Sequence, residues 1–189
     1  MTIENSEKPD RLRVLLGVSG GIAAYKAVEL ARRLGTGNAA VRTVMTQAAC
    51  MLVGPKSFEA VTGSPVHVDM WETSPPESIS HVSLAQWADV VVVAPATADA
   101  IAKIANGICD DLLSTLICAC WPKPVLLAPA MNDAMWQNPA VQRNVERLGK
   151  TGYTLIGPET GPLACGRDAI GRMSEPEKIV EAIFKSSRP

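Results

Sequence analysis

The turn Gly17-Val18-Ser19-Gly20-Gly21-Ile22 joins an apolar stretch to a segment with helical spacing. Glycines in such a turn let backbone N–H groups approach an anion, and a helix N-terminus favours negative charge. The turn therefore predicts a phosphate site, with a tight turn for close helix packing as the alternative. The spacing is not Gly-x-Gly-x-x-Gly and no Gly-Lys-Ser/Thr follows, so neither a dinucleotide nor a nucleoside triphosphate is specifically indicated.

A second turn, Pro129-Ala130-Met131-Asn132-Asp133-Ala134-Met135-Trp136, also follows an apolar stretch. The amide of Asn132 is able to donate a hydrogen bond to a substrate carboxylate. Met135 and Trp136 would form a soft wall against a ring or a thiol-bearing chain. In the alternative interpretation Asn132 caps a helix and the two large side chains belong to the core.

Three further features are open to a chemical or a structural interpretation. Thr97 or Asp99, in the turn Ala94–Asp99, either caps a helix or contacts a ligand. His81 is either a general base near neutral pH or a solvated side chain. The odd number of cysteines indicates a reducing cytoplasm, and structural thiols are expected at the first four of them. The cysteines are Cys50, Cys109, Cys118, Cys120 and Cys165, and none stands at zinc-ligand spacing from a histidine, so no metal site is predicted.

Alternating strands and helices must position these residues. Strands are predicted at Arg11–Val18, Ala40–Met45, Asp89–Ala94, Pro124–Ala128 and Tyr153–Ile156. Helices are predicted at Ile22–Leu34, Thr46–Leu52, Ser57–Gly63, His81–Ala88, Ala98–Ile108, Asp111–Cys120, Pro139–Leu148 and Glu175–Phe184. This order predicts an α/β, doubly wound, three-layer, Rossmann-like fold with five or six parallel strands. Ligands bind such sheets beyond the carboxyl ends of the strands, where the turns named above and the segment Met45–Gln47 would meet.

Length and composition limit the remaining possibilities. A chain of 189 residues with 47% hydrophobic residues predicts a single domain over 1–189. Residues 1–11 are expected to form a polar, flexible lead without a secretory signal, and the glycine-rich segment 157–173 is expected to form a long loop or flap. The net charge is −1, with no basic stripe for nucleic acid, and no apolar run approaches the ~20 residues that span a membrane.

The chain resembles the flavin-containing cysteine decarboxylases from about residue 12 to its C-terminus. The matching segments are Gly17–Lys26, Val44-Met45-Thr46, His81-Val82-Ser83-Leu84, Trp87-Ala88-Asp89, Ala94–Asp99, Lys103–Leu113, Pro129–Trp136, Leu163-Ala164-Cys165-Gly166 and Gly171–Pro176. The Pro-Ala-Met-Asn-x-x-Met-Trp block is highly specific. The family includes enzymes that act on phosphopantothenoylcysteine in coenzyme A biosynthesis and enzymes that act on C-terminal cysteines of lantibiotic-type peptides.

The resemblance implies FMN as the cofactor and assigns expected roles to individual residues. FMN would be held by Ser19, Gly20, Gly21, Ile22, Thr46, Ala96 and Thr97. His81 would act as a base, Asn132 would bind the substrate carboxylate, and Cys165 would donate a proton in a reductive second half-reaction. Met135 and Ala164 would contact the substrate beside them.

The implied reaction is a carbon–carbon lyase reaction that needs an electron sink. Oxidation of the cysteinyl CH₂–SH to a thioaldehyde supplies it, because the C=S group lies β to the carboxylate that leaves as CO₂. Ala-Cys-Gly favours phosphopantothenoylcysteine as substrate. Three departures keep the peptide substrate open: Arg167-Asp168-Ala169 replaces the usual Asp-x-Gly, Ser83 replaces a frequent acidic residue, and the given sequence stops at Pro189, where a ligase domain is expected in most bacterial homologues.

The resemblance also implies an assembly. Family members are trimers, or dodecamers built from trimers, with FMN at the subunit boundary. Leu112–Cys120, Trp71 and Trp121 are the expected contact surface. Two other classes with related sequences fit less well. A phosphatase-binding regulatory subunit would need acidic extensions, and a flavin prenyltransferase would not carry Asn132 and Cys165.

Overall fold

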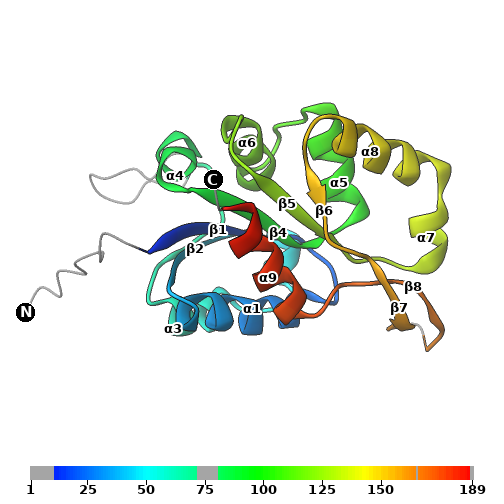
Figure 1. The fold of residues 1–189 in the computed structure, drawn as a ribbon, viewed down its shortest axis with the longest axis horizontal. Helices are drawn as coiled ribbons and strands as arrows, with labels where there is room; N and C mark the ends of the chain where they lie inside the picture. Colours follow the sequence, from blue (N-terminus) through cyan, green and yellow to red (C-terminus); the bar gives the residue numbers. More distant parts are fainter. Residues whose placement is uncertain (1–10, 72–80, 165, 188–189) are drawn as a thin grey trace, which may run out of the picture.

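Six parallel strands form the central sheet of the computed structural model, which describes residues 11–71, 81–164 and 166–187 (Figure 1). The strands are β1 (Leu12–Val18), β2 (Ala39–Met45), β3 (Val66–His67), β4 (Val90–Ala96), β5 (Val125–Pro129) and β6 (Thr154–Leu155). Their spatial order is β3-β2-β1-β4-β5-β6. The strand β4 lies in the middle of the sheet and is buried along its whole length, which explains why its residues form a continuous apolar run rather than an alternating one.

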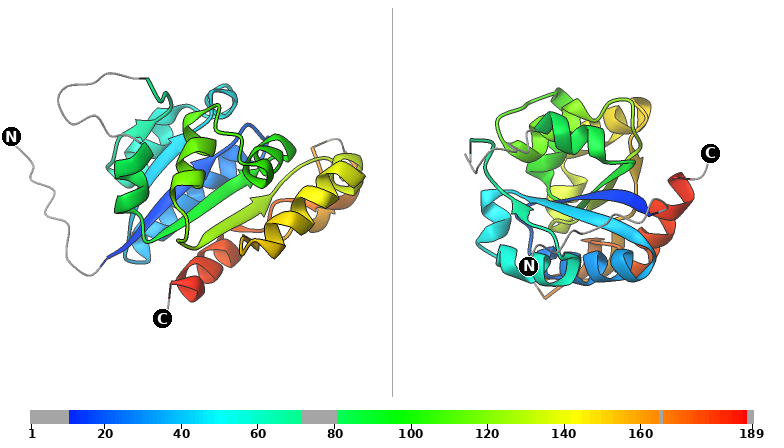
Figure 2. Two further views of the ribbon diagram at one scale, coloured as in Figure 1. Left: turned by 90° about the horizontal axis from the view of Figure 1, so that it is seen from above. Right: turned by 90° about the vertical axis from the view of Figure 1, so that its left-hand side faces the viewer.

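Helices cover both faces of the sheet (Figures 1 and 2). One face carries α1 (Ala24–Thr36), α3 (Pro55–Thr62) and α9 (Pro176–Ser186). The other carries α4 (His81–Trp87), α5 (Ala98–Asn106), α6 (Leu112–Ala119) and α8 (Pro139–Lys150). Successive residues of β1 point to opposite faces, so Val14 and Leu16 pack on the first layer and Leu15 on the second. The predicted three-layer α/β fold is confirmed.

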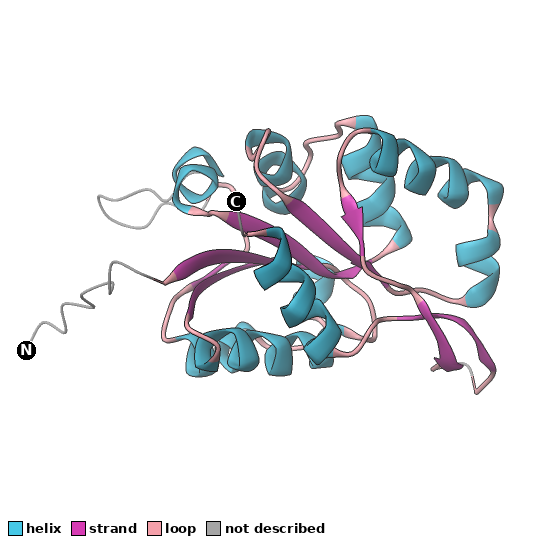
Figure 3. Cartoon of the chain, in the orientation of Figure 1, coloured by secondary structure: helices cyan, strands magenta, loops and turns pink. Residues whose placement is uncertain are grey.

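Four short elements differ from the sequence prediction (Figure 3). The edge strand β3 and the helix α7 (Asp133–Gln137) were not predicted, because two and five residues are too few to show periodicity. The segment predicted as an irregular flap contains an antiparallel hairpin of β7 (Glu159–Pro162) and β8 (Asp168–Arg172). Glycine and proline residues interrupt the alternation of apolar and polar residues by which a strand is predicted. The hairpin forms through cross-strand pairs such as Thr160 with Ile170.

The expected contact surface at Leu112–Cys120 is largely wrong. Leu112, Leu113, Leu116, Ile117 and Cys120 are buried against the sheet and belong to the core. Other apolar side chains are exposed to solvent instead, directly after the short helix α2 (Gln47–Cys50) and in the loop after β3. Met51 is 86% exposed, Trp71 79% and Trp121 69%, so the two tryptophans are exposed as expected.

The cysteines are only partly the structural thiols that the sequence predicted. Cys120 is buried and Cys50 half-buried, but Cys109 and Cys118 are exposed, since they lie in a loop and on the outer side of α6. All four are free thiols. Within the described ranges no group of three or more potential ligands is placed to hold a metal ion, and no helix is long and apolar enough to cross a membrane.

Candidate functional site

The chain leaves the neighbouring strands β1 and β4 in opposite directions, because β1 continues into α1 on one face and β4 into α5 on the other. A crevice forms where such connections diverge, beyond the carboxyl ends of the strands. A pocket of about 1310 Å³ lies there. It is lined by Ser19–Ala23, Tyr25, Lys26, Thr46–Ala48, Thr97–Asp99, Lys103, Asp111, Ala130–Asn132, Met135, Pro162–Ala164 and Gly171–Met173.

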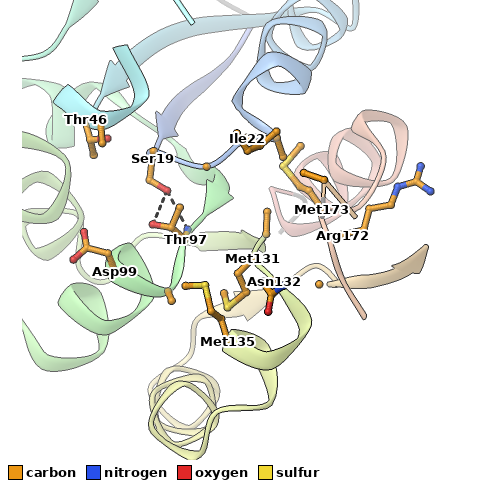
Figure 4. A pocket seen from close by; sticks show the side chains of 18 of the residues that line it. Ser19, Ile22, Thr46, Thr97, Asp99, Met131, Asn132, Met135, Arg172 and Met173 are labelled. Atoms are coloured by element: carbon orange, nitrogen blue, oxygen red, sulfur yellow. Dashed lines mark hydrogen bonds between the residues drawn. The ribbon is translucent and has the colours of Figure 1, made fainter. Parts of the chain in front are cut away.

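A hydrogen-bonded link between Ser19 and Thr97 joins the turns that follow β1 and β4 (Figure 4). The Ser19 hydroxyl donates to the Pro95 carbonyl oxygen at 2.7 Å and accepts from the Thr97 backbone N–H at 3.0 Å. The Thr97 hydroxyl in turn accepts from the Ala100 N–H and caps α5. Ser19 is only 2% exposed. The two turns are therefore held in one arrangement at the base of the pocket.

The backbone around Gly20 is packed too closely for a larger residue. A Cβ at Gly20 would lie 2.4 Å from the Cβ of Ala48. Thr46 holds this contact, since its N–H donates to the Val18 carbonyl at 3.0 Å and its side chain caps α2. The start of α1, which has no side-chain cap, follows directly. Bare backbone beside a helix N-terminus is the arrangement that accepts a phosphate.

The opposite wall of the pocket is apolar and carries one amide (Figure 4). Met131 and Met135 flank Asn132, whose side-chain oxygen accepts from the Ala134 N–H at 2.9 Å. That bond makes Asn132 the N-cap of α7 and fixes the plane of its amide. The capping and the chemical interpretations of Asn132 are therefore compatible, because one side chain caps the helix with its oxygen and borders the pocket. These residues suit a flat aromatic group that carries a phosphate.

Charged side chains surround the pocket in two groups, and Asp99 is the one member that the sequence analysis named as a candidate ligand contact. Lys103 lies 3.0 Å from Asp111, 3.1 Å from Asp110 and 3.5 Å from Asp99. The hydrogen bond that Lys103 donates to Asp111, together with the neighbouring carboxylates, raises the pKa of Lys103. Burial by itself would raise the pKa of the Asp111 carboxyl. The hydrogen bonds that Ser114 and Lys103 donate to it outweigh this effect, so the pKa is lowered.

The second charged group lies at the flap side of the pocket. The Glu175 carboxylate accepts from Lys26 Nζ at 3.1 Å and is also bonded by Arg172. Lys26 and Arg172 both line the pocket, so this group carries a net charge of about +1 there. The segment Gly171–Pro176 contains Arg172 and Glu175 and was named in the sequence analysis as part of the family resemblance, but no role was assigned to these charged side chains.

Most of the residues expected to form the site meet in the pocket. They are Ser19, Gly20, Gly21, Ile22, Thr46, Thr97, Asn132, Met135 and Ala164. Ala96 does not line the pocket, because it is buried in β4 and its carbonyl accepts from the Ala130 N–H. His81 is the first residue of α4 and does not line the pocket of its own chain. Cys165 lies outside the described residues.

A family model described as Flavoprotein matches residues 2–188. The chain therefore belongs to the flavoprotein family.

The curated relatives carry more specific names than the family model does. The coenzyme A biosynthesis bifunctional protein CoaBC of Bacillus subtilis is 48% identical over 172 residues, which cover 91% of this chain and 42% of that protein. The protein of the same name from Escherichia coli K12 is 46% identical over 169 residues, 89% of this chain and 41% of that protein. The chain thus spans less than half the length of these curated relatives.

Two solved structures are similar over nearly the whole chain. A cysteine-to-serine mutant of PPC decarboxylase complexed with pantothenoylaminoethenethiol has a TM-score of 0.80 at 35% identity, covering 93% of this chain and 97% of that one. The FMN-dependent cysteine decarboxylase SpaF has a TM-score of 0.78 at 37% identity, covering 94% and 98%.

Replacing Asp111 by Asn should reduce stability at neutral pH by about 1 kcal/mol, because Asn keeps the helix cap but removes the charge that faces Lys103. A carboxyl whose folded pKa is lowered stabilises the fold above its unfolded pKa, about 3.9, and loses that contribution as pH falls through the folded value. Urea unfolding should therefore show a difference in the free energy of unfolding between Asp111→Asn and the unmodified chain at pH 7, and this difference should shrink below pH 4. Asp99→Asn, at a side chain 74% exposed, is the control and should have a smaller effect. An undiminished difference in acid would contradict the assignment.

Proposed function

We propose that this chain binds FMN in the pocket and uses it to decarboxylate phosphopantothenoylcysteine to phosphopantetheine. The observation that carries the proposal is the pocket itself, which joins a glycine-rich phosphate cradle to an apolar wall with Asn132. The similarity to PPC decarboxylase and to CoaBC proteins supports the substrate. We also propose one FMN-binding domain over 1–189, with the flap at 157–173.

Ser19, Gly20, Gly21, Thr46 and Thr97 would hold the FMN phosphate and ribityl chain at the base of the pocket. The capped N-termini of α2 and α5 and the start of α1 converge there. Ile22, Met131 and Met173 provide apolar surface for the flavin ring. When bound, FMN accepts the electron pair removed from the substrate's CH₂–SH group, which is chemistry that no side chain here supplies.

Asn132 would bind the substrate carboxylate through its NH₂ group and hold it in line for loss of CO₂. Its amide plane is already set by the bond to Ala134, so little ordering is needed when substrate binds. Met135 and Ala164 would enclose the cysteinyl chain from two sides. The positive charge at Lys26 and Arg172 favours an anionic substrate in the same pocket.

His81 would remove a proton from the substrate in the pocket of a second copy of the chain. The support is its position, since it starts α4 on the outer layer and does not border its own pocket. The exposed apolar residues Met51, Trp71 and Val82 supply surface for such a contact. We therefore propose that the chain forms a trimer, or a dodecamer built from trimers. The free thiols support a reducing compartment, the cytoplasm.

After CO₂ has left, Cys165 would donate a proton while the electron pair that FMN would hold returns to the substrate carbon, and the two together would complete a net decarboxylation. The solved PPC decarboxylase that carries a cysteine-to-serine change is complexed with an aminoethenethiol, two hydrogens short of an aminoethanethiol, and this supports the role. A C-terminal peptide cysteine is the second candidate substrate, favoured by Arg167-Asp168-Ala169, which stands where Asp-x-Gly is expected of an enzyme that acts on phosphopantothenoylcysteine. Mass analysis with both substrates offered separately decides between them by the loss of CO₂.

The purified protein should be yellow, with one FMN per chain. Gly20→Ala should weaken FMN binding at least about tenfold, because the added methyl group presses on Ala48 at the cradle. Gly54→Ala is the matched control, since a Cβ there meets no atom within 4 Å. Titration of FMN fluorescence measures both. A colourless protein that takes up no added FMN would refute the proposal.

The two half-reactions should separate by mutation. Asn132→Asp should abolish bleaching of the flavin by substrate, because it places a like charge against the substrate carboxylate. Cys165→Ser should still bleach the flavin and release CO₂, but its product should remain two hydrogens short, since a serine hydroxyl is a far weaker acid than a thiol. Absorbance and mass spectrometry read the two effects. Fully reduced product from Cys165→Ser at the unmodified rate would exclude the proton-donor role.

Two inactive variants should complement each other if the site is shared between copies. Co-expressed His81→Asn and Asn132→Asp chains, mixing at random, should restore about a quarter of the sites, since each site takes one residue from each copy. Light scattering should give a mass that is a multiple of three chains. Mixed oligomers without activity would place His81 and Asn132 in the same chain's site and contradict the proposal.

A further inference from the structure

Two separate segments of the chain form adjoining walls of the pocket. One wall comes from Met131, Asn132 and Met135, at the carboxyl end of β5. The other comes from the β7–β8 hairpin, through Leu163 and Ala164 near its turn and Gly171 at its base. The distance between these walls sets where a substrate lies, so the contacts that join them affect binding without touching the substrate.

The first contact joins the base of the hairpin to the Asn132 segment through the backbone. The Met131 N–H donates to the Gly171 carbonyl at 3.0 Å. Gly171 has a φ of 135°, and a Cβ there would lie 2.2 Å from the Met131 carbonyl oxygen. Only glycine allows this approach, so the base of the hairpin is fixed by backbone packing alone.

The second contact joins the turn of the hairpin to the same segment through side chains. Arg167 Nη2 lies 2.6 Å from Asp133 Oδ1. The Asp133 side chain is 15% exposed and that of Arg167 60%. The Arg167 carbonyl also accepts from the Leu163 N–H at 2.8 Å, so the ion pair acts directly on the backbone of a residue that lines the pocket. Asp133 follows Asn132 directly and starts α7.

We propose that the Asp133–Arg167 ion pair is a positioning contact that seats the β7–β8 hairpin against the Asn132 segment and so sets the width of the substrate side of the pocket. Neither residue lines the pocket, and both act through neighbours that do: Asp133 through Asn132, and Arg167 through Leu163. The functional part of this inference rests on the proposed decarboxylase activity.

The residue types in this chain make the contact possible. An aspartate at the position of Arg167 would place a second negative charge against Asp133, and the two side chains would repel each other. Arg167 and Asp133 instead carry opposite charges and form an ion pair.

The test is a double-mutant cycle on the FMN-loaded protein with Arg167→Gln, Asp133→Asn and the double variant. Hydrogen exchange followed by mass spectrometry reads the backbone amides of peptides from the hairpin. Each single variant should speed exchange at Leu163 about threefold, the size expected of a partly exposed ion pair, and the double variant should add nothing further. Arg167→Lys keeps the positive charge, so its exchange rate at Leu163 should stay close to that of the unmodified protein. Glu146→Gln is the control, because it breaks an ion pair of similar length on α8, away from the hairpin, and should leave exchange there unchanged.

The same variants, assayed with phosphopantothenoylcysteine, should raise KM by a similar factor while the FMN content stays at one per chain. Unchanged exchange in both single variants, or effects that add in the double variant, would overturn the positioning role. Faster hairpin exchange in a protein that turns over no substrate would instead refute the proposed decarboxylase activity and leave the contact established. Altered exchange with unchanged KM would show that the contact does not position substrate, and would overturn that part of the proposal.

Discussion

The hydroxyl of Ser19 bonds to the turn after β4, and the arrangement of the whole pocket depends on this contact. The turns after β1 and β4 carry their helices to opposite faces of the sheet, so they would separate without a link across the gap. A buried hydroxyl that both donates and accepts satisfies the Pro95 carbonyl and the Thr97 N–H at once. With the turns joined, the N-termini of α1 and α5 face the same space and bring their positive ends together.

Close backbone packing is the second constraint, and it appears on both sides of the pocket. At Gly20 the chain passes against Ala48, and at Gly171 it passes against Met131. In each case a side chain would occupy the space where two segments meet. The small residues that made these turns conspicuous in the sequence therefore have a steric cause as well as a chemical one. They let the backbone itself form the walls of the pocket, which leaves room for a large planar ligand.

One chain supplies an incomplete set of groups for the proposed reaction. The phosphate cradle, the apolar wall and Asn132 lie in a single pocket, whereas His81 starts a helix on the outer layer. Burial of the apolar face of α6 in the core leaves Met51, Trp71 and Val82 among the apolar side chains on the surface. An assembly that covers these residues and delivers His81 to a neighbouring pocket would resolve both observations together. Such an assembly would link the formation of an oligomer to the proposed chemistry rather than to stability alone.

The sequence by itself determined the layers of the fold and most of the pocket. Long apolar strands and amphipathic helices repeat with clear periods, and turns at the carboxyl ends of parallel strands must meet at one edge, so Ser19, Thr46, Thr97 and Asn132 were predicted to converge. Only the tertiary structure decided that Ala96 faces away, that Leu112–Cys120 is core, and that the flap is a hairpin. It alone brought Lys103 to its carboxylates and Arg167 to Asp133. The reason is that periodicity is a local property carried by neighbours in sequence, whereas an ion pair across 34 residues depends on how separate elements pack, which no local pattern encodes.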